Sequence, residues 1–184
     1  MNKSRLYFVA LIPPEPILSE VKGFKEQVAT TYNSKAALRS PAHITLHMPF
    51  QYREDREEKL WNVFQNFVTT ASPFEILQDG FGCFEPRVIY VNVEKSAELD
   101  SLRSDLVKTM RRELNLDNAD YKNLPFHPHM TIAFRDLKKT VFPEAWGNFE
   151  KLPFKATWKC HSFCLLKHTG KIWLPHKEFI FQKK

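Results

Sequence analysis

The order strand, helix, strand, helix, strand occurs twice along this chain, and this repetition limits the available folds more than any other feature of the sequence. The first copy is read from apolar runs, helical spacing and alternation of polar with apolar side chains over residues 7–12, 15–32, 43–48, 53–70 and 74–77. The same order returns between residue 87 and about residue 166, after a turn expected at residues 79–82. Its helices are expected at about residues 96–114 and near residues 142–149. Because the order repeats, we expect two similar lobes rather than one continuous sheet.

The two halves are expected to pack as lobes of one globule. Lobe one is placed at about residues 5–77 and lobe two at about residues 87–166, with a terminal hairpin over residues 160–182. No long linker separates the halves, and 43% of the 184 residues are hydrophobic, which is enough for a sizeable core. We therefore expect a single globular domain over residues 1–184, with any cleft between the lobes lined by one strand from each half.

Each half carries one His-x-Thr triplet on a segment predicted to be a strand. These triplets are His43-Ile44-Thr45 and His129-Met130-Thr131. Residues i and i+2 of a strand point to the same face, so each triplet presents an imidazole beside a hydroxyl while Ile44 or Met130 turns into the core. So short a pattern is weak evidence by itself, but its recurrence in matching strands favours a shared site over two satisfied core or surface histidines.

Two imidazoles facing each other across a cleft suit an in-line displacement at phosphorus. One can take a proton from the attacking oxygen while the other gives one to the leaving oxygen, and histidine can do both near neutral pH. The hydroxyls of Thr45 and Thr131 can donate to phosphoryl oxygens, where charge must be stabilised. This chemistry needs no metal ion and no cofactor.

The sequence resembles the 2H phosphoesterase superfamily, which is named for such paired triplets. Within that superfamily it is similar to the 2′-5′ RNA ligase branch. Similar segments cover the opening strand, both motifs and the region between them: residues 8–11, 42–46, 80–82, 87–93 and 125–133. The resemblance implies an α+β, bilobal fold with pseudo-twofold symmetry, two β-sheet lobes with helices outside, and a central cleft. It also implies catalytic His43 and His129, and phosphate-binding Thr45 and Thr131.

What the resemblance implies about function is a hydrolase of 2′,3′-cyclic phosphates or an RNA ligase. The expected partner is RNA with a 2′,3′-cyclic phosphate end or a small cyclic nucleotide. A non-catalytic module that binds a nucleotide or an RNA end on the same fold is the alternative. Intact His and Thr in both motifs favour catalysis, because a binding module has little use for two opposed acid-base groups.

Further side chains around the motifs are candidates for auxiliary roles. His47 is expected to share a face with His43 and Thr45, and His127 with His129 and Thr131. Four histidines would also permit a metal site, but their spacing matches no recognised ligand pattern, so no metal is expected. Aromatic side chains that could stack on a base are Phe50, Tyr52, Phe84, Tyr90 and Trp173, and cations that could attract a phosphate are Arg87 and Lys122.

Composition narrows the class of protein further. The formal net charge of +6 is mild and favours an anionic substrate only weakly. No apolar run is long enough to cross a bilayer, so no membrane partner is expected. The three cysteines form an odd set that favours reduced thiols, and the N-terminal segment is unlike a secretory signal, so we expect a cytoplasmic monomer.

Overall fold

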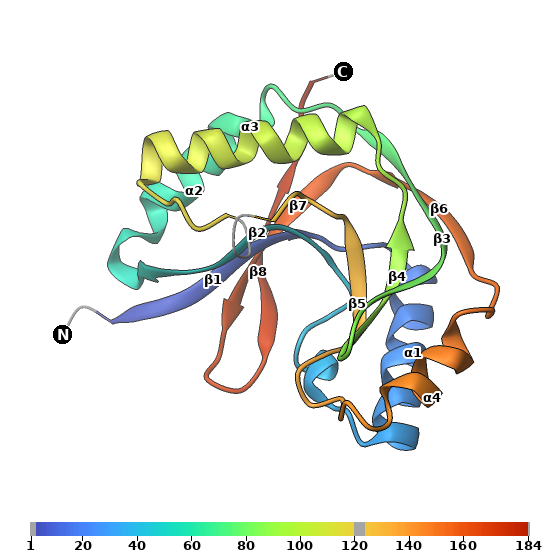
Figure 1. Cartoon of the computed structure of the whole chain (residues 1–184). Helices are drawn as coiled ribbons and strands as arrows, with labels where there is room; N and C mark the ends of the chain where they lie inside the picture. The colour runs from blue at the N-terminus through green and yellow to red at the C-terminus, as the bar shows by residue number, and fades with distance from the viewer. Residues whose placement is uncertain (1–2, 120–123, 184) are drawn as a thin grey trace.

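Two antiparallel sheets form the framework of the protein. The structure is a computed structural model that describes residues 3–119 and 124–183, and within these residues each sheet has four strands (Figure 1). The first sheet has the order β2-β1-β7-β8, with β1 Ser4–Leu11, β2 Ile44–Arg53, β7 Ser162–His168 and β8 Trp173–Ile180. The second has the order β5-β4-β3-β6, with β3 Phe74–Phe84, β4 Val88–Val93, β5 His129–Ala133 and β6 Lys155–Cys160. The two motif strands, β2 and β5, therefore lie at matching edges of their sheets.

Four α-helices accompany the sheets in the described residues: α1 Ile17–Tyr32, α2 Glu57–Val68, α3 Ala97–Leu114 and α4 Phe142–Phe149. Short 3-10 turns at Ala36–Arg39 and Glu54–Arg56 precede β2 and α2. Helix α3 shows how the local sequence sets an end: the Ser96 hydroxyl accepts a hydrogen bond from the Leu99 backbone N–H, and Asn115 closes the helix in the left-handed conformation. None of the described helices combines the length and apolar character needed to cross a membrane.

The helices interlock the two halves of the chain. Helix α1 follows a strand of the first sheet but packs against β5 of the second, and Phe24 in α1 contacts Phe81 and Phe149. Helix α3 follows a strand of the second sheet but packs against α2 and β2, and Figure 1 shows α2 and α3 together on the side opposite α1 and α4. One large apolar core runs through both sheets as a result.

The expected division into lobes needs a correction at two strands. Strand β3 pairs with β4 and β6, so residues 74–77 belong to the second sheet and not to lobe one. Strand β7 pairs with β1, so residues 162–166 belong to the first sheet and not to lobe two. The prediction assigned each strand to the half that precedes it, whereas strand pairing places it in the other sheet. Strands β7 and β8 pair as an antiparallel hairpin over Ser162–Ile180.

The α+β class is confirmed, and most predicted elements lie where the sequence placed them. Helix α4 has the predicted bounds, and α1 and α3 agree within two residues. One expected turn is wrong: residues 79–82 lie inside β3, which runs through a register shift between Gln78 and Phe81. A β-bulge absorbs the irregular backbone there without ending the strand.

Candidate active site

The first motif lies at the start of the edge strand β2. His43 directly precedes the strand, Ile44 is buried in the core, and Thr45 is half-buried opposite Ala10 of β1. The His43 ring lies 4.8 Å from the ring of Phe8, centroid to centroid. Phe8 and Ala10 belong to a small apolar cluster with Cys164 and Leu166, which is separate from the main core. The surroundings of His43 on this face of the sheet are therefore apolar.

The second motif repeats this arrangement at the start of the edge strand β5. His129 is the first residue of the strand, Met130 is fully buried, and Thr131 is half-buried opposite Tyr90 of β4. The His129 ring lies 4.9 Å from the Tyr90 ring. The predicted alternation is therefore present in both motifs: His and Thr share one face, and the residue between them turns into the core.

Both imidazoles are held in the same way. The Nδ1 of His43 donates to the Pro41 carbonyl at 2.8 Å, and the Nδ1 of His129 donates to the His127 carbonyl at 2.7 Å. In each motif the acceptor is the carbonyl two residues earlier in the chain. Because a carbonyl oxygen can only accept, the proton of each neutral ring lies on Nδ1 and leaves the lone pair of Nε2 available for proton transfer.

Burial and nearby charge set the protonation of the two rings. The pKa of His43 is lowered to about 3, mainly by burial and then by the positive charges of Lys25 and His129, against the hydrogen bond to Pro41. Burial also lowers the pKa of His129, with a smaller contribution from the charge of His127. Strands β2 and β5 contact each other, and the charge of His129 acts on His43, so the two histidines lie near each other.

His127 and Tyr90 extend the site on the side of the second sheet. Tyr90 Oη and His127 Nε2 share a hydrogen bond of 3.1 Å, and His127 is exposed. The ring of Phe84, whose side chain is 41% exposed, lies 5.3 Å from the rings of both His127 and His129. Gly82, opposite Tyr90, leaves room for this cluster, because a Cβ there would lie 2.5 Å from the Tyr90 ring.

The placement of His47 is a correction. The sequence predicts that it shares a face with His43 and Thr45, but its side chain is fully buried and lies 5.4 Å from the core ring of Phe50. In the pairing of β1 with β2, Val9 lies opposite His47 and the next residue, Ala10, lies opposite Thr45. Leu46 is therefore an extra residue in β2 with no partner in β1. This bulge turns His47 to the core face, because an extra residue reverses the alternation of a strand. The Nδ1 of His47 donates to the Met48 carbonyl at 2.8 Å.

Only some of the aromatic and basic side chains that were predicted to contact a nucleotide lie near the two histidines. Phe84, Tyr90 and Trp173 lie near the histidines, Trp173 through a ring contact of 4.7 Å with Phe8. Phe50 is buried in the main core and Tyr52 packs against it, so neither is placed to stack on a base. Arg87 donates to the Arg135 carbonyl at 3.0 Å, and Lys122 lies outside the described residues.

Sequence reasoning missed one charged residue beside the site, Lys25. It lies on α1, where Ile17, Val21 and Val28 form the buried stripe, and its side chain is only 2% exposed. Its Nζ donates to the carbonyls of Ser40 and Pro41, each at 3.1 Å. The available signal was a lysine at helical spacing within an apolar stripe, a position where charged residues are rarely found without a partner.

The side chains that commonly bind metal ions do not cluster in the described part of the chain. Over residues 3–119 and 124–183, no three His, Cys, Asp or Glu side chains converge in a way that could hold an ion. Cys160 and Cys164 are buried free thiols, whose pKa is raised by burial to about 12 and about 11. The burial of both side chains is typical of cysteines that pack in a core.

An α+β fold of two four-stranded sheets, with an edge strand of each presenting His and Thr beside the other, defines the class of the 2H phosphoesterases. The sequence model of the 2′-5′ RNA ligase superfamily matches residues 13–172, and the chain belongs to this family.

Relatives with assigned names agree with this class. A protein of Bacillus mycoides, named provisionally as a phosphoesterase, is 26% identical over 179 residues, which cover 96% of each chain. A second of that provisional name, from Bacillus cytotoxicus, is 30% identical over 177 residues, covering 93% of this chain and 94% of the relative.

Solved structures of similar fold cover almost the whole chain. TT0787 of Thermus thermophilus has a TM-score of 0.71 at 18% identity, covering 97% of this chain and 99% of its own. LigT of E. coli, complexed with 3′-AMP, has a TM-score of 0.71 at 19% identity, covering 98% of this chain and 100% of its own. At these identities the likeness shows the fold alone.

Proposed function

We propose that the protein is a metal-independent phosphoesterase that opens 2′,3′-cyclic phosphates at RNA ends or in a related cyclic nucleotide. The observation that carries this proposal is the matched anchoring of His43 and His129, each by its Nδ1 to the carbonyl two residues earlier. A structural histidine has no need of this duplication. Two rings that each keep Nε2 available are suited to opposite proton transfers in one reaction.

The reaction is a displacement at phosphorus by water. The water oxygen forms a bond to phosphorus, and the bond from phosphorus to one ribose oxygen breaks. One imidazole takes a proton from the water, and the other gives a proton to the leaving ribose oxygen, so the product is a phosphomonoester beside a free hydroxyl. If a ribose hydroxyl of a second RNA end replaces water, the same two proton transfers join the ends.

Thr45 and Thr131 are assigned to the phosphoryl oxygens. Each hydroxyl lies on the same strand face as its histidine, two residues further along the chain. A hydroxyl that donates to a non-bridging oxygen stabilises the negative charge that must be held during the displacement. Together, the two histidines and two threonines supply the proton transfers and the charge stabilisation.

A nucleotide is the substrate class that the surroundings of the site favour. Phe84, Tyr90 and His127 form an aromatic cluster beside His129, and Phe8 and Trp173 lie beside His43, so a base could stack on either side. Crystal structures of LigT, which shares the fold, are described as complexed with 3′-AMP, ATP and NADP+.

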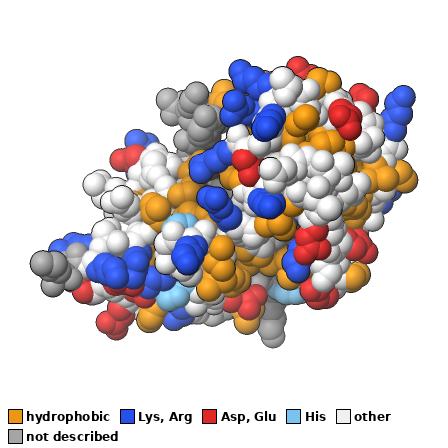
Figure 2. All heavy atoms as spheres, turned by 90° about the horizontal axis from the view of Figure 1, so that it is seen from below, with side chains coloured by type: hydrophobic (Ala, Val, Ile, Leu, Met, Phe, Trp, Pro, Cys, Tyr) orange, Lys and Arg blue, Asp and Glu red, His pale blue; other side chains and the backbone are white. Residues whose placement is uncertain are grey.

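Surface charge favours recognition of one phosphate group over tracking of a long polyanion. Figure 2 shows Lys and Arg scattered among hydrophobic and acidic side chains over the face in view, not gathered into one basic stripe. A long nucleic acid would be held mainly by many phosphate contacts along such a stripe. We therefore expect an end group or a small nucleotide to carry most of the specific contacts.

The test is incubation of the protein with each nucleoside 2′,3′-cyclic monophosphate in excess EDTA, followed by chromatography of the products. We expect conversion to a 2′- or 3′-monophosphate that continues in EDTA. Binding without product would favour the non-catalytic module, and activity that needs added zinc or magnesium would contradict the metal-independent mechanism. An RNA with a cyclic phosphate end and a partner with a free 5′-hydroxyl, analysed in the same way, would reveal joining.

A further inference from the structure

Lys25 is a buried cation that the two-histidine chemistry does not account for. Its side chain is 2% exposed on the inner stripe of α1, and burial lowers its pKa to about 8. Placing an ammonium group in such a position is costly unless hydrogen bonds compensate for lost hydration. The carbonyls of Ser40 and Pro41 supply that compensation at 3.1 Å each.

The Pro41 carbonyl links Lys25 directly to His43. This one oxygen accepts both the Nζ–H of Lys25 and the Nδ1–H of His43. The orientation of the His43 ring therefore depends on a carbonyl that α1 holds in place, and α1 packs against β5, the strand of His129. Lys25 thus connects the segment before β2 to the helix that packs against β5.

The second motif differs at the corresponding point. The His127 carbonyl accepts the Nδ1–H of His129, but no Lys or Arg side chain donates to that carbonyl within residues 3–119 and 124–183. The charge of His127 has only a small lowering effect on the pKa of His129, whereas Lys25 places an ammonium group on the Pro41 carbonyl that also holds the His43 ring. Two motifs that are matched in backbone geometry are therefore unequal in charge.

We propose that Lys25 is a positioning residue that makes the two histidines unequal, orienting His43 through the Pro41 carbonyl and keeping it neutral so that it serves as the base and His129 as the acid. This inference rests on the proposed phosphoesterase function. A neutral His43 takes the proton of the attacking water through Nε2, and a protonated His129 gives its proton to the leaving ribose oxygen. The exchange leaves His43 protonated and His129 neutral, and transfer to solvent restores both.

Several groups around His43 act on its protonation, and together they favour the neutral ring. Lys25 acts from α1 and His129 from β5, both of which disfavour a charged His43 ring, while only the Pro41 carbonyl favours it. Phe8, on the neighbouring strand β1, presents an apolar ring. The largest influence is burial, and Lys25 is the next, so removal of the Lys25 charge should be detectable at His43.

The first experiment follows the ring protons of His43 and His129 by NMR against pH, which needs no catalytic turnover. We compare the wild type with Lys25→Met, which removes the charge, and Lys25→Arg, which keeps it. Lys22→Met is the matched control, because Lys22 lies on the same helix with a side chain that is 66% exposed and paired with Glu26. A cation at this range should change the proton affinity of His43 by about tenfold.

We expect the pKa of His43 to increase in Lys25→Met, to stay low in Lys25→Arg and to be unchanged in Lys22→Met, while that of His129 moves less. In the wild type, the His43 signal should also show a small inflection near pH 8, where Lys25 loses its proton. This inflection tests the proposal even if Lys25→Met does not fold. Its absence, or an unchanged His43 in a folded Lys25→Met, would overturn the proposal.

The second experiment measures turnover of a 2′,3′-cyclic nucleotide by the same variants against pH. Lys25→Met should show an acid limb moved to higher pH, and Lys25→Arg should restore the position found in the wild type. A purely structural lysine would lower activity equally at every pH. If the wild type turns over no cyclic phosphate, the proposed function fails, while the NMR titration still decides whether Lys25 controls His43.

Discussion

At the scale of single residues, the two anchored imidazoles determine how the activity should depend on pH. In the proposed mechanism, the productive form has a neutral His43 and a protonated His129. Burial lowers the pKa of His129 below the ordinary imidazole value of 6.5, and that of His43 to about 3. As pH rises, the acid is lost first, and as pH falls, the base is lost only in strong acid.

We therefore expect kcat/KM for a cyclic nucleotide to decrease with increasing pH along a limb centred below pH 6.5. The profile of the free enzyme is the relevant one, because kcat/KM reports groups before substrate binds. Initial rates measured from about pH 4 to about pH 9 at low substrate concentration provide the check. A kcat/KM that increases all the way into the alkaline range would contradict the assignment of an imidazole acid.

The same residues show what sequence reasoning could reach at this scale. The triplets at His43 and His129 could be predicted because alternation along a strand is a local property. His47 could not be placed, because the bulge that turns it inward depends on how β2 pairs with β1. Lys25 was visible as an interruption of an apolar stripe, but its contact with Pro41 depends on the packing of α1.

At the scale of elements, β3 allows Tyr90 of β4 to pack closely beside the site because residue 82 of β3 is a glycine. A Cβ at Gly82 would lie 2.5 to 2.7 Å from the Tyr90 ring atoms, so Gly82→Ala must displace a ring that contacts His127 and His129. We expect a loss of stability of about 1 to 3 kcal/mol from overpacking. Turnover should fall on the order of tenfold because the aromatic cluster is disturbed.

Chemical denaturation and steady-state kinetics would measure both effects of this substitution. Gly23→Ala is the control, because a Cβ at Gly23 on α1 meets no atom within 4 Å. That change should leave turnover unaltered and stabilise the helix by roughly 0.5 to 1 kcal/mol. Equal activity of the two variants would mean that Tyr90 has no part in the site.

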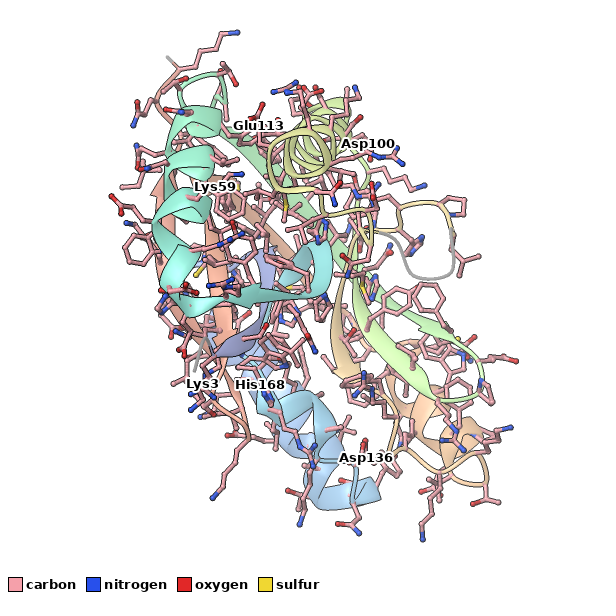
Figure 3. The ribbon with its side chains drawn as sticks, turned by 90° about the vertical axis from the view of Figure 1, so that its left-hand side faces the viewer. Lys3, Lys59, Asp100, Glu113, Asp136 and His168 are labelled. Atoms are coloured by element: carbon pink, nitrogen blue, oxygen red, sulfur yellow. The ribbon has the colours of Figure 1, made fainter. Side chains whose placement is uncertain are left out.

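A second element-scale contact joins the loop after α1 to the loop after β5. The Asp136 carboxylate accepts hydrogen bonds from the Ser34 hydroxyl and from the backbone N–H groups of Lys35 and Ala36, at 2.7 to 2.9 Å. Figure 3 shows Asp136 at the end of α1. Burial raises the pKa of Asp136, but these three hydrogen bonds outweigh burial and hold the pKa below its ordinary value.

A carboxylate with a lowered pKa stabilises the fold above the pKa of the unfolded chain, and the contribution is lost as pH falls through the folded value. Asp136→Asn should therefore cost about 1 kcal/mol near neutral pH, since the site is exposed, and less in acid. Urea unfolding at neutral pH and in mild acid would measure this. Asp79→Asn, which removes an exposed pair with Lys155, should change stability less, and equal losses would contradict a stabilising role of the Asp136 contact.

Sequence patterns were most accurate in predicting the positions of helices and strands. Helices α1, α3 and α4 could be placed because spacing and capping residues lie within each segment. The predicted strand ended before residues 79–82, whereas β3 continues through them. Glycines usually mark a turn in a sequence, but in β3 they allow a bulge and the approach of Tyr90. That distinction depends on a partner strand, which no local pattern contains.

At the scale of the whole molecule, the halves exchange elements, and this exchange creates the site. Strand β3 completes the second sheet, β7 completes the first, and α1 crosses from one sheet to the other. The duplication predicted two lobes, but sheet pairing between distant segments decided which strand belongs to which. The motif strands β2 and β5 are edge strands in contact, which is the arrangement that the proposed shared site requires.

The most direct test of this paired site is a double-mutant cycle on turnover of a 2′,3′-cyclic nucleotide. His43→Ala and His129→Ala should each lower turnover on the order of 10² to 10⁴, while His161→Ala, at an exposed position remote from both motifs in sequence, should keep full activity. The double variant should be about as active as the weaker single variant, because both histidines act on one transition state. Losses that multiply in the double variant, or a His129→Ala enzyme with full activity, would contradict the paired acid-base site.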